Sequence, residues 1–148
     1  MAKGYPDYFG YSVFPQYGTP NFTTFIFLNI IPAATQECFE ILSKGSIRTG
    51  YIRLKSAADF FATVHVKVWI DSILLFDNDP WDEYWSGQDQ SISSVVTLSR
   101  MALTGGAYYV DFIFNTDWTF AHQVKVAVVN NSAANIDTWG NFIYAKVA

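Results

Sequence analysis

Apolar and polar residues alternate strictly in the middle of the chain. In the segment TVHVKVWID (63–71), one face of a strand would carry Val64, Val66, Val68 and Ile70. The residues between them, which are polar or amphipathic, would lie on the other face. The same period of two appears in YYVDFIFN (108–115) and HQVKVAVVN (122–130). Shorter apolar runs predict further strands at 22–31, 36–43, 46–55, 72–76, 91–99 and 141–147. Because no window of about twelve residues has a period near 3.6, the pattern predicts an all-β protein.

Turn-forming residues separate these runs at short spacing. They occur at Pro32, Lys44-Gly45, Asn78 to Pro80, Gly105-Gly106 and Asn130-Asn131. Many short strands with frequent turns are typical of a sandwich or barrel. We therefore predict a jelly-roll-like antiparallel β-sandwich of about eight or nine strands, formed by residues 22–148 as one domain.

The first 21 residues differ from the rest in their pattern. The segment MAKGYPDYFGYSVFPQYGTPN contains three glycines and three prolines, which disfavour both a helix and a central strand. Its aromatic side chains make it too apolar for a disordered tail: Tyr5, Tyr8, Phe9, Tyr11, Phe14 and Tyr17. Two placements are open, a first strand wrapped around its own sandwich and an extended arm whose rings dock on a neighbouring subunit. We predict an extended N-terminal arm over residues 1–21, with these rings as its anchors.

Composition points to a protein that associates with other proteins. Charged residues make up 15% of the chain, compared with about 25% in typical domains, and aromatic residues make up 18%. We expect part of this large apolar surface to face a partner. The net charge of −4 and the scattered basic residues argue against nucleic-acid binding. The apolar run 22–31 is shorter than the roughly 20 residues that span a bilayer, and the first residues lack the apolar core of a signal peptide, so no membrane partner is expected.

Residues suited to metal or nucleophilic chemistry are scarce. Cys38 is the single cysteine, which excludes a disulfide within the chain and permits folding in a reducing compartment. His65 and His122 are the only histidines, and each falls inside an alternating strand. One cysteine and two distant histidines are a poor ligand set for zinc. No local signature of a catalytic nucleophile or a phosphate loop is present. We predict no enzymatic activity, no cofactor and no metal site.

The segment DNDPWDEYWSG (77–87) combines four acidic residues with three aromatic ones. Its carboxylates could ligate Ca²⁺, although the spacing lacks the glycine-centred turn and terminal glutamate of an EF-hand. Its rings, Trp81, Tyr84 and Trp85, could stack on sugars or anchor a protein interface. Paired carboxylates for glycoside hydrolysis would need a separation that the sequence does not define. Among these possibilities we favour a structural loop that is partly core and partly contact surface.

Two blocks of the sequence resemble virion proteins of tailed bacteriophages. In that pattern a strand and turn lead into a glycine-containing strand and, after a spacer, into the motif v-k-v-x-I-D-G. The corresponding segments here are 41–47, Gly50-Tyr51-Ile52 and 66–73, and the ending of the chain over 108–147 is also similar. Ser72 stands where the pattern prefers Gly, and Asp71-Ser72 adopts the positive φ angles of a tight hairpin less readily than Asp-Gly.

The resemblance implies a structural component of the virion, assembled in the host cytoplasm. Decoration, head-fibre, tail and baseplate proteins share the pattern. The aromatic arm favours a capsid decoration or auxiliary protein, because arms that cross neighbouring subunits tie a shell together. The implied partners are further copies of the chain, with a trimer as the first expectation, and the major capsid protein or other virion proteins. A receptor-facing module of the tail or baseplate, or a carbohydrate-binding β-sandwich, is the alternative.

Overall fold

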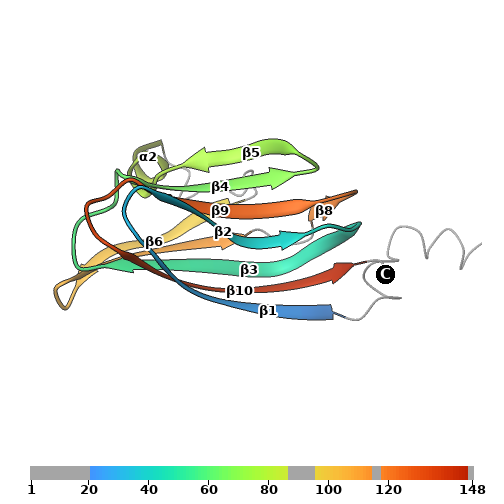
Figure 1. Ribbon diagram of the computed structural model, residues 1–148, viewed down its shortest axis with the longest axis horizontal. Coiled ribbons are helices and arrows are strands. Elements are labelled where there is room, and N and C mark those ends of the chain that lie inside the picture. Colours follow the sequence, from blue (N-terminus) through green and yellow to red (C-terminus); the bar gives the residue numbers. More distant parts are fainter. Residues whose placement is uncertain (1–20, 87–95, 115–117, 147–148) are drawn as a thin grey trace, which may run out of the picture.

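The protein is described by a computed structural model over residues 21–86, 96–114 and 118–146. Most of these residues lie in strands (Figure 1), which are β1 (Asn21–Ile30), β2 (Ala34–Ile41), β3 (Gly45–Ser56), β4 (Val64–Ile70), β5 (Ile73–Asn78), β6 (Val96–Thr104), β7 (Ala107–Phe114), β8 (Trp118–Phe120), β9 (Val124–Asn130) and β10 (Ile136–Lys146). In the described part of the chain a single short helix, α2 (Pro80–Ser86), interrupts them. The prediction of an all-β protein is confirmed. The predicted N-terminal arm and its aromatic anchors lie outside the described residues.

The strands form two antiparallel sheets that pack as a sandwich. Sheet A has the order β1-β10-β3-β7-β6, with β8 also paired to β3, and sheet B has the order β2-β9-β4-β5. The hairpin β4–β5 is enclosed in turn by the pairs β3–β7, β2–β9 and β1–β10. This nesting of pairs, in which successive pairs alternate between the sheets, is the topology of a jelly roll. The predicted jelly-roll-like sandwich is therefore confirmed, with β6 and β8 as additional strands in sheet A.

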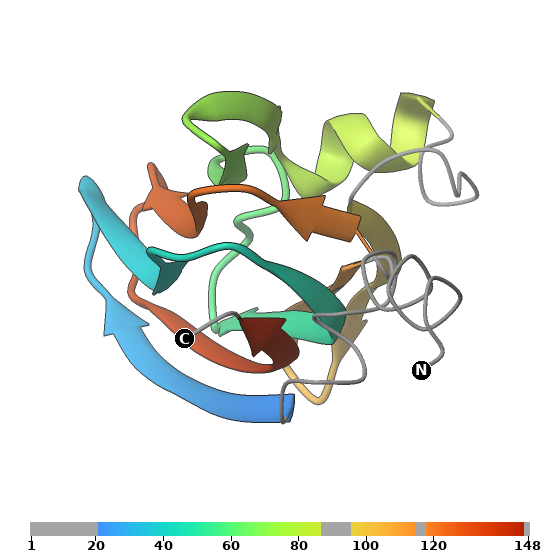
Figure 2. The same cartoon turned by 90° about the vertical axis from the view of Figure 1, so that its right-hand side faces the viewer.

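The core fills the space between the two sheets, which Figure 2 shows end-on. Every second residue of a strand points inward, so the alternation seen in the sequence becomes burial: Val64, Val66 and Val68 are fully buried. Aromatic rings fill the centre. The ring of Phe142 stacks on Phe39, with ring centroids 4.2 Å apart, and meets Phe114 edge-on at 4.8 Å.

Phe142 also explains why a glycine stands on the neighbouring strand. Gly50 of β3 pairs directly with Phe142 of β10. A Cβ atom added to Gly50 would lie 2.5 Å from the Cδ1 atom of Phe142, which is inside van der Waals contact. A glycine at position 50 therefore leaves room for the ring of Phe142 to pack against the backbone of β3.

The tight turn between β4 and β5 forms although serine replaces the glycine that such turns prefer. The turn residues Asp71 and Ser72 have φ angles of 50° and 70°, both in the left-handed region. Hydrogen bonds hold this conformation from outside the hairpin. The carboxylate of Asp71 accepts hydrogen bonds from three successive backbone N–H groups, those of Ala121, His122 and Gln123. The main-chain N–H of Asp71 donates to the carbonyl oxygen of Gln123.

These contacts predict a pH-dependent contribution of Asp71 to stability. Hydrogen bonds from the N–H groups of Ala121, Gln123 and His122 lower the pKa of the Asp71 carboxyl below its usual value. The contribution is therefore complete above the unfolded-state pKa of about 4, and it is lost as the pH falls through the lower folded-state pKa. We expect Asp71→Asn to lower the melting temperature at pH 7 and the difference from wild type to shrink toward pH 3.

The control for this prediction is Asp59→Asn. Asp59 is an exposed aspartate that accepts one backbone N–H, from Phe61 at 3.0 Å, and holds no turn in a left-handed conformation. We expect a smaller effect from this substitution at pH 7. Thermal melts at several pH values measure both variants. A deficit of Asp71→Asn that is the same at pH 7 and pH 3 would show that the charge of Asp71 does not stabilise the turn.

Candidate functional site

The acidic and aromatic segment 77–87 forms the end of β5 and the helix α2, and Gly87 lies outside the described residues. Asp79 caps the helix, because its Oδ1 atom accepts a hydrogen bond from the N–H of Asp82 at 2.7 Å. Pro80 follows as the first helical residue. Proline is favourable at this position because the N–H group that it lacks would have no partner within the helix. Our prediction of a loop was wrong here. The Asp-Pro pair followed by acidic residues is a helix-start signal that the search for longer periods missed.

Three of the four carboxylates of this segment, those of Asp77, Asp79 and Glu83, accept hydrogen bonds or ion pairs from protein donors. Asp77 contacts the Nδ1 atom of His65 at 3.2 Å and the Nζ atom of Lys67 at 3.5 Å. The buried side chain of Glu83 accepts a hydrogen bond from the Nδ2 atom of Asn78 at 2.7 Å. Within residues 21–86, 96–114 and 118–146, no group of three or more His, Cys, Asp or Glu side chains is placed to hold a metal ion. The segment thus works as a helix cap and a salt-bridge cluster.

The three aromatic residues of α2 lie at the surface. Trp81, Tyr84 and Trp85 are exposed, with Trp85 at 67%. The rings of Trp81 and Trp85 meet at an interplanar angle of 68°, and those of Tyr84 and Trp85 at 85°. A flat sugar-stacking platform needs rings that share a plane, so this edge-to-face cluster does not form one. Its shape instead suits insertion into an apolar pocket of a partner.

Strand β5 continues this apolar surface. It is an edge strand of sheet B, and in the described part of the chain β4 is the strand that pairs with it. Three consecutive residues, Ile73, Leu74 and Leu75, are exposed, with Ile73 at 62%. The helix α2 follows β5 directly and contacts β6, the edge strand of sheet A, so β5 and α2 occupy one side of the sandwich (Figure 2). We call Ile73, Leu74, Leu75, Trp81, Tyr84 and Trp85 the β5–α2 surface.

A second surface covers the outer face of sheet A. The register places side chains of four strands side by side in rows, such as Phe27 of β1, Trp139 of β10, Arg53 of β3 and Asp111 of β7. The rows on either side bring Tyr51 and Ile113 together, and Lys55 and Tyr109. The β1 end of this face is strongly apolar, since Phe25 is 77% exposed and Phe27 is also exposed.

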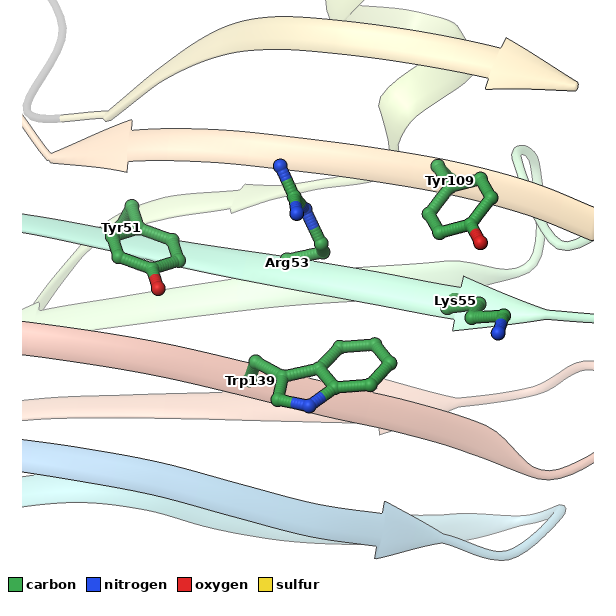
Figure 3. A pocket seen from close by; sticks show the side chains of 5 residues that line it. All are labelled: Tyr51, Arg53, Lys55, Tyr109 and Trp139. Carbon is green, nitrogen blue, oxygen red and sulfur yellow. The ribbon is translucent and has the colours of Figure 1, made fainter. Parts of the chain in front are cut away.

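The centre of this face is a shallow cavity of about 340 Å³. Figure 3 shows the side chains that line it, which are Tyr51, Arg53, Lys55, Tyr109 and Trp139. Two hydrogen bonds fix the Arg53 guanidinium on Asp111: its Nε and Nη2 atoms lie 2.7 and 2.8 Å from the two carboxylate oxygens. This bidentate contact raises the pKa of Arg53 and holds its charge at the cavity floor.

Three other side chains of the cavity, those of Lys55, Tyr109 and Trp139, take part in contacts with aromatic rings. The Nζ atom of Lys55 lies 5.6 Å from the ring centroid of Tyr109, and the guanidinium of Arg100 lies 5.1 Å from the same centroid. The indole of Trp139 meets Phe27 at a centroid distance of 5.8 Å and an interplanar angle of 64°. The cavity therefore joins aromatic rings to positively charged side chains, of which Arg53 is fixed by Asp111. We call Tyr51, Arg53, Lys55, Tyr109 and Trp139 the sheet A cavity.

The residues of the sheet A cavity were not predicted as a site from the sequence. Tyr51, Arg53 and Lys55 alternate within the predicted strand 46–55, which was the signal that they share an outward face. Trp139 falls in a stretch where no strand was predicted, and only the pairing of β10 with β3 brings it beside Arg53. Spatial neighbours on different strands depend on register, which a single sequence does not reveal.

The contacts of Cys38, His65 and His122 are those of structural residues. Burial raises the pKa of the Cys38 thiol to about 12, which makes it a poor nucleophile at neutral pH. Its Sγ atom donates a weak hydrogen bond to the carbonyl oxygen of Gln36 at 3.5 Å. His65 lies in the salt-bridge cluster of sheet B with Asp77, and His122 is exposed beside the turn that Asp71 holds.

Comparison with known proteins finds similarity among solved structures. No protein family model matches the chain, and no curated protein matches it in sequence. Among solved structures, the cyanophage Pam1 capsid asymmetric unit matches with a TM-score of 0.46 and 14% sequence identity, covering 88% of this chain and 88% of that chain. A similarity of this size does not bear on the function of this chain. Among the residues described above, no helix is long and apolar enough to cross a membrane.

Proposed function

We propose that the chain is a non-enzymatic structural protein of a tailed-bacteriophage virion, and within it a capsid decoration or auxiliary protein. The observation that carries the proposal is the β5–α2 surface, where an edge strand and a short helix expose six large apolar side chains. An edge strand with apolar side chains is a template for pairing with another chain. The surface is covered by a neighbouring subunit, which makes the protein a homo-oligomer.

The sequence pattern shared with phage virion proteins supports this proposal. Its segments fall on regular parts of the fold: residues 41–47 span the connection from β2 to β3, and 66–73 span the hairpin β4–β5. That hairpin supplies the edge strand of the proposed contact. The pattern therefore includes the turn of the hairpin from which β5 starts.

Energetics favour an assembly with several contacts per subunit. Burying the exposed halves of six large apolar side chains contributes on the order of 5–10 kcal/mol gross. Association costs about 4–15 kcal/mol in lost translational and rotational freedom. One such contact is therefore marginal, whereas repeated contacts in a closed oligomer or a shell reinforce one another. Each bound subunit then stabilises the shell by binding its assembled state.

The N-terminal arm supplies the second set of contacts in this proposal. Its aromatic residues lie across neighbouring subunits, either other copies of the chain or the major capsid protein, and tie them together. The anchors are Tyr5, Tyr8, Phe9, Tyr11, Phe14 and Tyr17. The protein acts passively, and its location is the virion.

A receptor-facing module of the tail or baseplate, or a carbohydrate-binding sandwich, is the second candidate. The sheet A cavity favours it, because aromatic rings beside polar donors suit a sugar ligand. The ring geometry on α2 favours the first candidate, since perpendicular rings anchor proteins better than they stack on sugars. We therefore place protein contact at α2.

Size-exclusion chromatography with light scattering tests the proposed self-association. We expect the full-length protein to be oligomeric and Leu74→Glu to shift it to the monomer, because the new charge would be buried at the contact. Phe25→Glu is the control, since Phe25 is even more exposed than Leu74, at 77% compared with 44%, but lies on sheet A. This variant is expected to keep the wild-type mass. A variant with serine at Tyr8, Phe9 and Tyr11 reports the contribution of the arm. A wild-type protein that stays monomeric at high concentration would contradict the proposal.

A further inference from the structure

We propose that the sheet A cavity is a binding site for an acidic saccharide, a glycan whose sugar rings carry carboxylates. The cavity lies on the sheet opposite the one that carries β5. The inference deepens the second candidate function, sugar binding at this cavity, by naming the class of saccharide. It does not rest on the structural role, because none of the cavity residues belongs to the β5–α2 surface.

The first element of the site is a supported aromatic ring. Figure 3 shows the indole of Trp139 spread out between Tyr51 on one side and Lys55 on the other. Phe27 packs edge-on against this indole. The face of an aromatic ring attracts the apolar C–H face of a sugar, whose hydroxyls then reach polar groups at the rim. A fixed ring loses little side-chain entropy when a ligand stacks on it.

The second element is a set of hydrogen-bond donors around the ring. The guanidinium of Arg53 has five N–H groups, and its contact with Asp111 uses two of them, so donors remain for a ligand. Lys55 also lines the cavity and adds an ammonium group. The hydroxyls of Tyr51 and Tyr109 can both donate and accept. Hydroxyls and carboxylates of a sugar acid match this set.

The charged side chains around the sheet A cavity favour an acidic ligand over a neutral one. Arg53, Lys55 and Arg100 gather on this face, opposed by the carboxylates of Asp111 and Asp137. The Asp111 carboxylate is occupied by Arg53, and that of Asp137 accepts a hydrogen bond from Asn29 at 2.7 Å. These three cations and two carboxylates leave a formal charge of about +1 on this face, in a chain of net charge −4. Single carboxylates on separate sugar rings suit such a small positive site, whereas the dense phosphates of a nucleic acid would meet the negative charge of the whole protein.

Titration of the full-length protein with defined saccharides tests the site. The probes are tetragalacturonate and, as its neutral counterpart, a galactose oligomer of the same length, followed by calorimetry and tryptophan fluorescence. We expect the acidic probe to bind at least tenfold more tightly than the neutral one, with an affinity that falls as salt rises. Trp139→Ala should weaken binding of the acidic probe at least tenfold.

Matched variants separate the two elements of the site. Lys55→Met keeps the aliphatic chain and removes the charge, so it should lower affinity for the acidic probe and leave the neutral probe unchanged. Tyr51→Ala, at an exposed position, provides a second test if Trp139→Ala folds poorly. Trp85→Ala on α2 and Lys67→Met on sheet B are controls that should bind like wild type.

Three results would overturn the inference. They are equal affinity for both probes, no binding of the acidic probe, and a loss of oligomeric mass in Trp139→Ala, which would make the cavity a protein contact. Because Leu74→Glu alters the β5–α2 surface alone, its monomer should bind the saccharide normally. Failure of the saccharide site and failure of the structural role are therefore distinguishable.

Discussion

Replacing Phe142 by alanine is expected to destabilise the protein by about 3–5 kcal/mol, the usual range for removing a fully buried ring. Phe142 stacks on Phe39 and meets Phe114, so it joins β2 of sheet B to β7 of sheet A through β10. Gly50, which lies against the ring, has no side chain that could fill the space left by its removal. Urea unfolding of both proteins at one concentration measures the loss, which corresponds to roughly 10–20 °C in melting temperature.

The control is Phe25→Ala. It removes the same ring from a position that is 77% exposed, and we expect a change within about 0.5 kcal/mol. If both substitutions cost the same, the rings between the sheets would not form the cohesive centre of the fold. Equal protein concentrations are needed because self-association adds to the apparent stability.

Asn130→Ala is expected to lower the free energy of unfolding by about 2–4 kcal/mol, because it leaves buried backbone groups without a hydrogen-bond partner. Asn130 is fully buried at the end of β9. Its Nδ2 atom donates to the carbonyl oxygens of Ile30 and Ala134, at 2.8 and 2.9 Å, and its Oδ1 atom accepts from the N–H and the hydroxyl of Ser132. The side chain thereby fastens the end of β1 to the loop that leads into β10.

Asn131→Ala separates this role from a general effect of asparagine in the turn. Asn131 is exposed, and its main-chain N–H, which donates to the carbonyl oxygen of Thr63, remains in the variant. We expect nearly wild-type stability in the same urea experiment. A small loss for Asn130→Ala would mean that water or a shifted loop satisfies the freed groups.

Alternation and turn residues predicted most of the fold. The faces predicted for 63–71 are correct because burial on one side of a strand imposes a period of two. The turns at Pro32 and Gly105-Gly106 lie between strands as expected. Strand ends were less accurate: β10 begins at Ile136, although a strand was predicted only from 141. Asp137 and Gly140, which are rare in strands, interrupt the apolar alternation over 136–140. This stretch is a strand because it pairs with β1 on one side and with β3 on the other.

Short elements escaped prediction for a different reason. The helix α2 has seven residues and the strand β8 has three, so neither shows a measurable period. The hairpin at Asp71-Ser72 depends on N–H groups about fifty residues away in the sequence. Local preference made serine unfavourable there, and the long-range hydrogen bonds outweigh that preference.

The candidate site was predictable in part. Trp81, Tyr84 and Trp85 were identified from composition, and the structure places them at the surface. The exposed run Ile73, Leu74 and Leu75 looked like an ordinary core strand, because only the position of β5 at the edge of sheet B leaves it uncovered. The sheet A cavity needed the register of four strands, which no local pattern contains.

Amide hydrogen exchange along β5 tests most directly whether another subunit covers the β5–α2 surface. The exchange of residues 73–78 is compared between the wild-type assembly and Leu74→Glu, with the amides of β10 as an internal reference for intact folding. Pairing of β5 with a neighbouring chain predicts that these amides exchange at least tenfold more slowly in the wild-type assembly while β10 is unchanged. Equal exchange of residues 73–78 in the two proteins would show that β5 stays uncovered and would contradict the proposed contact.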